Sequence, residues 1–151
     1  MDELFMKEAL ILAREAFNEG EVPVGCVIVR GEEIVGRGRN RREGAKNALA
    51  HAEMEAIHDA CRRLGGWRLW ECTLYVTLEP CPMCAGAIIN ARVRRVVYGA
   101  KDLKNGACGS VTNLFELPFN HRPELVSGVL EEECGAVLTE FFKELREKKS
   151  K

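Results

Sequence analysis

Apolar positions along the chain change their spacing several times, and each change marks an expected element. From residue 4 to about 19 they recur every three or four positions, which predicts an amphipathic helix with Asp2 as its N-cap and Gly20 as its stop. The run 24–29 is apolar without interruption, and a second β-prone run, 34–36, follows a polar turn. These two runs predict a β-hairpin whose first strand is buried on both faces.

The remainder of the chain alternates between helical and β-prone patterns. Strong helix formers and apolar stripes predict three further long helices, at 50–64, 81–91 and 131–148. β-Branched and aromatic runs predict three further strands, at 73–78, 93–99 and 125–130, and a short helix is expected at 111–115. This order predicts an α/β protein with one central five-stranded sheet and helices on both of its faces.

Length and composition are consistent with one intracellular domain. The 151 residues contain no internal repeat or linker, so a single domain 1–151 is expected, with a basic tail at about 146–151. No apolar run approaches the roughly 20 residues that span a bilayer, and no secretory signal is recognised, so we expect no membrane partner and a cytoplasmic location. Seven cysteines predict reduced thiols, with five as packing residues: Cys26, Cys61, Cys72, Cys108 and Cys134.

Two short motifs carry the candidate chemistry. They are His51-Ala52-Glu53 and the segment 80–84, Pro-Cys-Pro-Met-Cys. Zinc accepts imidazole and thiolate ligands, and a catalytic zinc site has three protein ligands and leaves the fourth position to water or substrate. His51, Cys81 and Cys84 supply three ligands, and Glu53 is the candidate for moving protons to and from the water. The motifs therefore predict a zinc-dependent hydrolase.

The expected helices place these ligands at helix ends. His51 and Glu53 fall in the first turn of one predicted helix, whereas Cys81 and Cys84 open the next. Residues two apart on a helix point about 200° apart, so His51 and Glu53 can share a site only beyond the helix end. We therefore expect two helix N-termini to meet at the metal, where their dipoles favour thiolate over thiol.

A structural zinc site is the alternative interpretation of the same residues. It requires a fourth protein ligand, for which the candidates are Cys26, Cys72, Cys108 and His58. The separation of about 30 residues between His51 and Cys81 does not match the usual zinc-finger spacing. His58 by itself is expected to be a packing or surface histidine.

The two motifs match the known H-x-E and P-C-x-x-C signature of the zinc-dependent cytidine deaminase superfamily. Within that superfamily the chain most resembles the bacterial tRNA-specific adenosine deaminases, over nearly its whole length. The matching segments are 21–25 (EVPVG), 50–54 (AHAEM), 73–86 (TLYVTLEPCPMCAG), 96–100 (VVYGA), 120–122 (NHR) and 130–134 (LEEEC). One departure is Asn47-Ala48-Leu49, where many members of the family have Asp-Pro-Thr.

The resemblance implies a fold, a reaction and its partners. It implies a cytidine deaminase-like three-layer α/β/α sandwich with a mixed sheet, one zinc ion per subunit, a homodimer and no organic cofactor. It also implies conversion of adenosine to inosine at the wobble position of a tRNA anticodon stem-loop. In this reaction zinc-activated hydroxide attacks adenine C6, and Glu53 is the proton shuttle.

The same resemblance implies residues that bind the substrate. Asn40 corresponds to the residue that hydrogen-bonds the purine, while Val22, Pro23 and Leu78 wall the base pocket. Asp102 corresponds to an acidic position near the flanking nucleotide, where it can meet a ribose 2′-OH. Further candidate RNA contacts are Lys101, Asn120, His121, Arg122 and Phe142.

The charge distribution by itself does not identify the substrate. The net charge is −1, yet basic residues gather in three clusters: Arg37, Arg39, Arg41, Arg42 and Lys46; Arg92, Arg94, Arg95, Lys101 and Lys104; Lys143, Arg146, Lys148, Lys149 and Lys151. These clusters suit a phosphate-binding face or an ordinary solvated surface. Helical spacing predicts that Phe142 packs in the core, although it can also stack on a base. His121 is either a surface residue or an RNA contact.

Two other functions fit the motifs. One is a catalytically silent, zinc-stabilised RNA-binding module. The other keeps the chemistry and changes the substrate to free guanine or a cytidine-type nucleobase or nucleoside.

Overall fold

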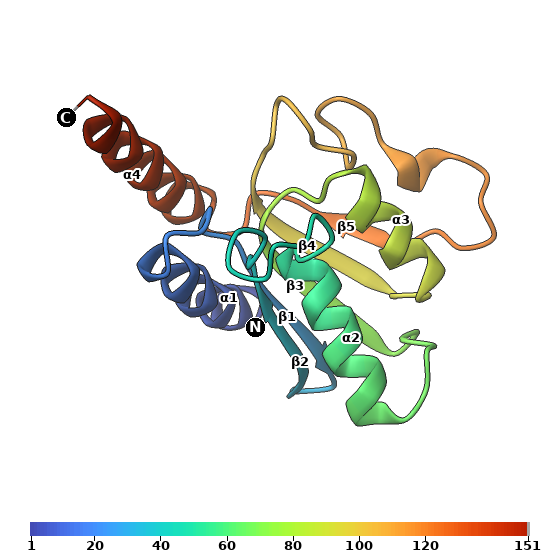
Figure 1. The fold of residues 1–151 in the computed structure, drawn as a ribbon. Helices are drawn as coiled ribbons and strands as arrows, with labels where there is room; N and C mark the ends of the chain where they lie inside the picture. The colour runs from blue at the N-terminus through green and yellow to red at the C-terminus, as the bar shows by residue number, and fades with distance from the viewer. Residues whose placement is uncertain (151) are drawn as a thin grey trace.

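The computed structural model describes residues 1–150 and has an α/β architecture (Figure 1). Its strands are β1 (Gly25–Arg30), β2 (Glu33–Arg39), β3 (Cys72–Leu78), β4 (Arg95–Ala100) and β5 (Glu124–Val126). Its helices are α1 (Asp2–Asn18), α2 (Ala52–Leu64), α3 (Pro82–Asn90) and α4 (Glu131–Lys149), with a 3₁₀ turn, η1, at Leu114–Glu116. Lys151, the last member of the third basic cluster, lies outside the described residues.

The strands form one mixed sheet in the order β2-β1-β3-β4-β5. β1 is antiparallel to both β2 and β3, whereas β3, β4 and β5 are parallel. The predicted five-stranded mixed sheet is therefore confirmed. Because β3 and β4 are parallel, their carboxyl ends lie at the same edge, which is the usual ligand-binding edge of an open α/β sheet.

Helices cover both faces of the sheet, and each face has its own apolar core (Figure 1). On one face, alanines of α2 and apolar residues of α3 pack against the sheet, with Ile28, Leu74 and Val96 among the buried strand residues. On the other face, α1 and α4 pack against alternate strand residues such as Val27 and Val97. This arrangement confirms the three-layer α/β/α sandwich and the double-sided burial of β1, of which only Arg30 is exposed.

Two glycines of β2 bring helix α2 close to the sheet. A β-carbon at Gly36 or Gly38 would collide with carbonyl oxygens of α2, those of Ala56 and Ala52 respectively. Only glycine permits such a close approach of backbone to backbone. The first turn of α2 is therefore seated directly on β2, and this contact fixes where His51 lies.

Some element boundaries differ from the sequence prediction. Asp2 is not the N-cap of α1 but its first helical residue, and its carboxylate accepts hydrogen bonds from Arg95 and Tyr75 instead. β2 is longer than predicted because Arg37 and Arg39 continue its alternation of exposed and buried positions. β5 has three residues, and in place of the short helix predicted at 111–115 the chain has the 3₁₀ turn η1, which begins three residues later.

The cysteines behave largely as predicted. All seven are free, and four of the five predicted packing cysteines are buried, whereas Cys61 is half-buried. Burial raises the pKa of the Cys108 and Cys134 thiols, which keeps them protonated and unreactive. Across residues 1–150, none of the helices combines the length and apolar character needed to cross a membrane.

Candidate active site

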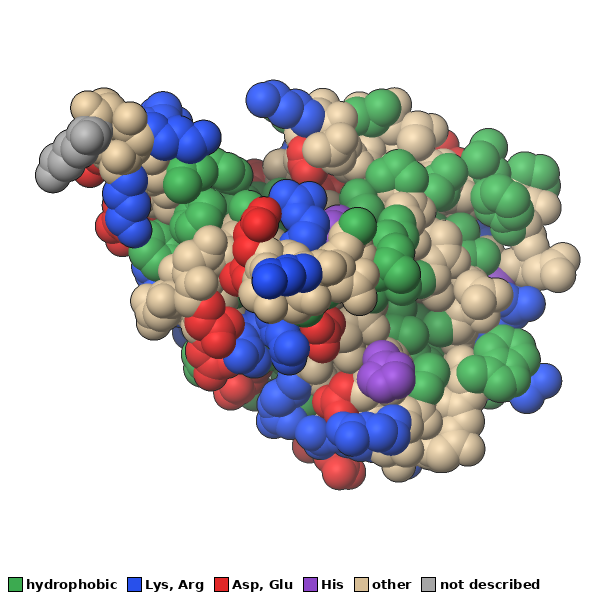
Figure 2. Space-filling view, in the orientation of Figure 1, with side chains coloured by type: hydrophobic (Ala, Val, Ile, Leu, Met, Phe, Trp, Pro, Cys, Tyr) green, Lys and Arg blue, Asp and Glu red, His purple; other side chains and the backbone are tan. Residues whose placement is uncertain are grey.

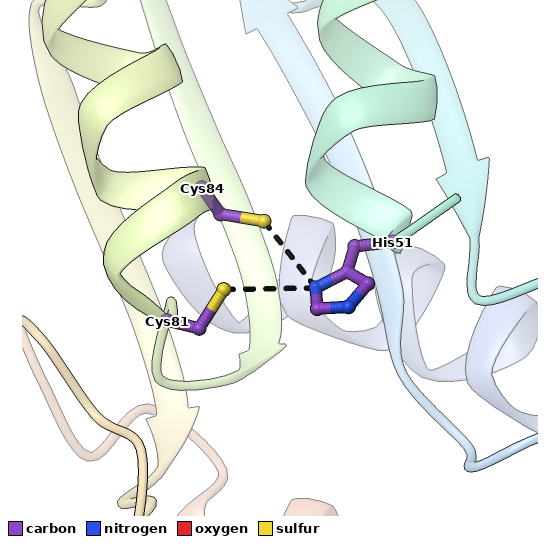
Figure 3. Close-up of side chains that lie close together, drawn as sticks. All are labelled: His51, Cys81 and Cys84. Carbon is purple, nitrogen blue, oxygen red and sulfur yellow. Dashed lines mark hydrogen bonds between the residues drawn. The ribbon is translucent and has the colours of Figure 1, made fainter. Parts of the chain in front are cut away.

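The three predicted metal ligands lie together between the starts of α2 and α3 (Figure 3). The Nδ1 atom of His51 is 3.7 Å from the Cys81 sulfur and 3.6 Å from the Cys84 sulfur. All three ligand atoms lie within 4.8 Å of one another. Segments 30 residues apart in the sequence are thus brought to one point, as the convergence of two helix N-termini predicted.

The local backbone explains why these side chains face one another. His51 and Cys81 are the N-cap residues of α2 and α3, with extended backbone angles, and neither side chain makes a capping hydrogen bond. Pro82 follows Cys81 at the first helical position, where its fixed φ angle suits the helix start. The two side chains therefore extend beyond the helix ends instead of folding back on them. Both helices begin slightly later than predicted, so His51 precedes the first turn of α2.

The geometry fits a tetrahedral zinc ion. With Zn–N bonds of about 2.0–2.1 Å and Zn–S bonds of about 2.3 Å, nitrogen and sulfur ligands stand roughly 3.5 Å apart. The observed separations of 3.6 and 3.7 Å are close to that value. Among residues 1–150, the three ligands form the one such group of histidine, cysteine and acidic side chains, and no fourth member joins them.

This arrangement weighs against a structural zinc site. The four candidate fourth ligands, Cys26, Cys72, Cys108 and His58, all lie outside the ligand group. His58 is exposed on α2, in agreement with its expected role as a surface histidine. A three-ligand set of this kind suits a catalytic zinc site, in which the fourth position serves water or substrate.

Electrostatics within the group favour a bound cation. A hydrogen bond from the Cys84 thiol, together with His51, lowers the pKa of Cys81 to about 4. The same hydrogen bond and burial raise the pKa of Cys84, while the Cys81 sulfur raises the pKa of His51. One thiolate is therefore already favoured, and metal binding displaces the protons that the other two ligands share with it.

Glu53 lies next to the ligands but is not one of them. It belongs to the first turn of α2, is 4% exposed and lines the same cavity as His51 and Cys81. Burial raises the pKa of Glu53 to about 7. A carboxyl group outside the metal's coordination sphere is free to carry protons.

Two of the three ligands, His51 and Cys81, line a cavity of about 720 Å³, whereas Cys84 is buried behind it. Its walls contain most of the predicted substrate residues, namely Val22, Asn40, Leu78, Lys101, Asp102 and Phe142. Residues that the sequence prediction did not assign to the site also line it: Val24, Arg42, Ala52, Glu79, Pro82, Leu103, Lys104, Asn105 and Leu138. This volume is in the range of ordinary small-molecule sites.

Asn40 reaches the cavity with part of its amide already engaged. The side chain is 8% exposed, its Nδ2 donates to the Val22 carbonyl at 3.1 Å, and its Oδ1 accepts from the Arg42 amide at 3.4 Å. An amide has two donor hydrogens and two acceptor lone pairs. One donor and one lone pair therefore remain for a ligand, and the two internal bonds hold the amide in a fixed orientation.

Other predicted site residues lie apart from this cavity. Pro23 is buried but does not line it. Asn120 lines a second cavity, of about 480 Å³, beside α3, and the His121 ring contacts the Val93 carbonyl at 2.5 Å. Arg122 is exposed. The structure therefore does not bring the segment 120–122 to the metal.

Phe142 and the basic clusters also differ from expectation. Phe142 is 41% exposed and lines the cavity, so the prediction that it packs in the core is wrong; the neighbouring Phe141 is the buried residue. Arg39 and Arg95 are paired with Glu19 and Asp2. The first and second basic clusters are therefore only partly available to bind phosphate.

Sequence reasoning missed two buried glutamates that hold neighbouring loops in place. The Glu21 carboxylate accepts hydrogen bonds from the amides of Glu43 and Gly44, and the Glu79 carboxylate accepts from the segment that follows β4. Both glutamates belong to segments that match the deaminase family, and this match was the one signal in the sequence that could have indicated their importance.

Comparison with known proteins agrees with this geometry. The family model described as MafB19-like deaminase matches residues 1–146. The chain is 57% identical to the tRNA-specific adenosine deaminase of Bacillus subtilis (strain 168) over 149 residues, which cover 98% of this chain and 92% of that protein. A solved structure from a study of A-to-I editing by tRNA deaminases at the wobble position has a TM-score of 0.86 and 45% identity, covering 89% of this chain and 98% of that one.

A related structure has a different named substrate. The guanine deaminase of Bacillus subtilis is 34% identical, with a TM-score of 0.63, and the match covers 78% of this chain and 86% of that one. The fold therefore extends beyond enzymes that act on tRNA. The higher identity and coverage of the first two matches decide the assignment: the chain belongs to the bacterial tRNA-specific adenosine deaminase family, within the cytidine deaminase-like superfamily.

Proposed function

We propose that this chain deaminates adenosine to inosine at the wobble position of a tRNA anticodon. The observation that supports this proposal most strongly is a three-ligand group beside a buried, non-ligating glutamate at an open cavity. A silent RNA-binding module does not need a buried acid in that place. The names of the similar proteins supply the substrate class, since they describe tRNA adenosine deaminases.

The metal that suits this site is zinc, held by His51, Cys81 and Cys84. Bound there, it supplies a water molecule whose pKa is lowered from 15.7 to roughly 7, so that a nucleophile is available at neutral pH. The residues of this chain then determine how the base is placed and where protons go. One ion per subunit is expected, because the described residues offer a single ligand group.

Glu53 performs the proton transfers in this proposal. It accepts the proton of the attacking water and delivers it to the ring nitrogen beside C6 of the adenine. It then takes the proton of the hydroxyl group now on C6 and delivers it to the amino group, which leaves as ammonia while the oxygen remains on C6 as a carbonyl. Such general acid–base transfers contribute about 10² to 10⁴ in rate. Burial keeps the carboxyl group away from bulk water during these steps.

The cavity walls orient the base. Val22 and Leu78 supply apolar surface, and the fixed amide of Asn40 keeps a donor and an acceptor for the polar edge of a purine. An amide matches adenine because it can donate to N7 and accept from the exocyclic amine. Asp102 also lines the cavity, where a carboxylate can accept a hydrogen bond from a ribose 2′-OH.

The surface around the cavity suits a polynucleotide. Figure 2 shows a hollow between α4 and the segment that follows β4, with Lys and Arg side chains on both sides. Arg42, Lys101 and Lys104 line the cavity itself, and Phe142 presents an exposed ring to it. Basic groups around an exposed aromatic ring are typical of single-stranded nucleic acid binding. The stem-loop therefore enters between α4 and this segment.

A free base is the second candidate substrate, and the similarity to a guanine deaminase is the observation that favours it. Zinc-loaded protein is incubated with an anticodon stem-loop that has adenosine at the wobble position, and separately with free adenosine, guanine and cytidine. We expect inosine in the stem-loop and none in a control stem-loop that has guanosine there. Deamination of a free base or nucleoside without any change in the stem-loop would overturn the tRNA assignment.

We also propose that the protein is a homodimer. Apolar side chains gather around α3 and the segment between β4 and β5 (Figure 2), and the exposed members include Val111, Leu117 and Phe119. Large exposed apolar patches mark association sites. Light scattering at micromolar concentration is expected to give twice the chain mass of 16.9 kDa, and the monomer mass would contradict this expectation. A cytoplasmic location and the absence of an organic cofactor remain predictions.

A further inference from the structure

One buried carboxylate ties the substrate wall of the cavity to the metal-binding turn. Glu79 is 2% exposed and stands between the end of β3 and the ligand Cys81. Its Oε1 accepts hydrogen bonds from the Asp102 amide at 3.1 Å and from the Ser110 hydroxyl. Its Oε2 accepts from the amides of Cys108 and Ser110, each at 3.0 Å. Four donors of one segment thus converge on a single side chain.

The segment that Glu79 holds is the one that forms the cavity wall. Lys101, Asp102, Leu103, Lys104 and Asn105 all line the cavity. Within this segment, Asp102 Oδ1 accepts from the amides of Lys104 and Asn105, so the wall residues form a turn built on Asp102. Glu79 in turn holds the backbone amide of Asp102. The position of the whole turn therefore depends on the Glu79 carboxylate.

The packing around Glu79 leaves little room for it to move. A β-carbon at Gly106 would collide with the Glu79 carboxylate, so glycine is needed for the segment to approach this closely. The Ala107 amide also donates to the Pro80 carbonyl at 2.9 Å, which adds a backbone link to the same turn. Burial raises the pKa of Glu79, but the hydrogen bonds from Ser110, Asp102 and Cys108 together lower it by more. The net pKa therefore lies below its ordinary value.

We propose that Glu79 is a positioning residue, which sets the distance between the metal ligands and the wall that meets the RNA. This inference rests on the proposed RNA substrate. The metal ligands are fixed by the packing of α2 and α3 on the sheet, whereas the turn at Asp102 is fixed by Glu79. Weakening the Glu79 contacts should therefore impair binding of the polynucleotide more than the chemical step.

The test is Glu79→Gln in the zinc-loaded enzyme. In either orientation of the glutamine amide, its NH2 group replaces one of the two carboxylate oxygens. This NH2 group then faces N–H donors that it cannot accept from. We expect KM for the anticodon stem-loop to rise by about tenfold, with kcat changed by less than about threefold, because binding common to ground state and transition state is lost. Zinc content should remain at one ion per chain.

A milder variant keeps the proposal testable if Glu79→Gln does not fold. Ser110→Ala removes one of the four donors and leaves the carboxylate in place. It should raise KM in the same direction by a smaller factor. If KM is unchanged in both variants, or if kcat falls by more than KM rises, the positioning role is wrong. Loss of zinc from Glu79→Gln would also overturn it, since Glu79 would then act on the metal turn.

Hydrogen exchange tests the placement without RNA. Glu79→Gln should accelerate exchange of the amides of Asp102, Cys108 and Ser110. Glu21→Gln is the matched control, because Glu21 is also buried and accepts two amide hydrogen bonds, but from Glu43 and Gly44 on another segment. Unchanged exchange in Glu79→Gln contradicts the positioning role. Failure of the wild-type enzyme to deaminate the stem-loop instead contradicts the proposed function, and the two failures are therefore distinguishable.

Discussion

The two sides of the cavity are held in place by different means. On the metal side, His51, Cys81 and Cys84 stand at the starts of helices whose apolar faces are buried against the sheet. On the substrate side, the turn around Asp102 is largely exposed, with Leu103 at 79%, and is attached through the carboxylate of Glu79. Packing in the core therefore fixes the positions of the metal ligands, whereas a few hydrogen bonds fix the position of the turn that meets the substrate. Changes on the metal side should abolish metal binding or turnover, and changes on the substrate side should raise KM.

Removal of a metal ligand should have the largest effect. Cys84→Ala leaves two ligands, so we expect zinc to fall well below one ion per chain and deamination to fall below detection. Cys134→Ala is the matched control, because Cys134 is also fully buried but belongs to α4 and packs in the core on the other face of the sheet, away from the ligands. Metal analysis and an inosine assay on both variants test this expectation. A fully loaded Cys84→Ala protein would show that the metal is held elsewhere.

Removal of the exposed ring at the cavity should have an intermediate effect, on binding alone. Stacking of a base on an aromatic side chain is worth about 1–3 kcal/mol, so Phe142→Ala should raise KM for the stem-loop by about tenfold and leave kcat nearly unchanged. Leu145→Ala is the control on the same helix, since Leu145 is 37% exposed but does not line the cavity. An equal rise in KM for both variants would indicate a general effect of α4 and not stacking.

The smallest effect concerns stability far from the cavity. Asp2 pairs with Arg95 through two hydrogen bonds of 2.7 and 2.9 Å, and the Arg95 hydrogen bond, together with that from Tyr75, lowers the pKa of Asp2 below 3.8. A lowered carboxyl pKa stabilises the fold at pH values above about 4, and this contribution is lost as the pH falls through the folded-state pKa. Asp2→Asn should therefore lower the free energy of unfolding by about 1 kcal/mol at pH 7.

The control for this prediction is Glu3→Gln, which removes a charge from an exposed position in the same helical turn. Denaturant unfolding at pH 7 and at pH 3 compares the variants with the wild type. The difference between Asp2→Asn and wild type should shrink at the lower pH. A difference that grows on acidification would contradict the role given to the ion pair.

Much of the metal side could be predicted from the sequence, because short motifs and helix start signals, each made of neighbouring residues, determine it. The spacing of His51, Cys81 and Cys84 predicted a ligand group that the structure does bring together, and the helix start signals placed these residues at two N-termini that do meet. The sheet followed from runs of β-prone residues, although β5, with three residues at an edge, has too little pattern to fix its ends. Helix ends and strand interiors are determined largely by neighbours in the chain.

The substrate side could not be predicted in the same way, because its contacts join residues far apart in the sequence. Glu79 was not assigned to the site, because its hydrogen-bond partners lie 23 to 31 positions away in the sequence. Asp2 was predicted to cap α1, but Arg95 competes for its carboxylate. Helical spacing could not tell which of Phe141 and Phe142 faces the core, since α4 extends beyond the sheet toward its end (Figure 1).

The central claim is that a buried glutamate beside a three-ligand zinc site carries protons for the deamination of RNA. Glu53→Gln tests it most directly, because the amide keeps the shape of the side chain but cannot shuttle protons. Glu55→Gln is the control on the same helix, since Glu55 does not line the cavity. With zinc content and stem-loop binding unchanged, we predict that kcat for inosine formation falls by about 10² to 10⁴ in Glu53→Gln alone. A zinc-loaded Glu53→Gln protein that forms inosine at the wild-type rate would contradict the account.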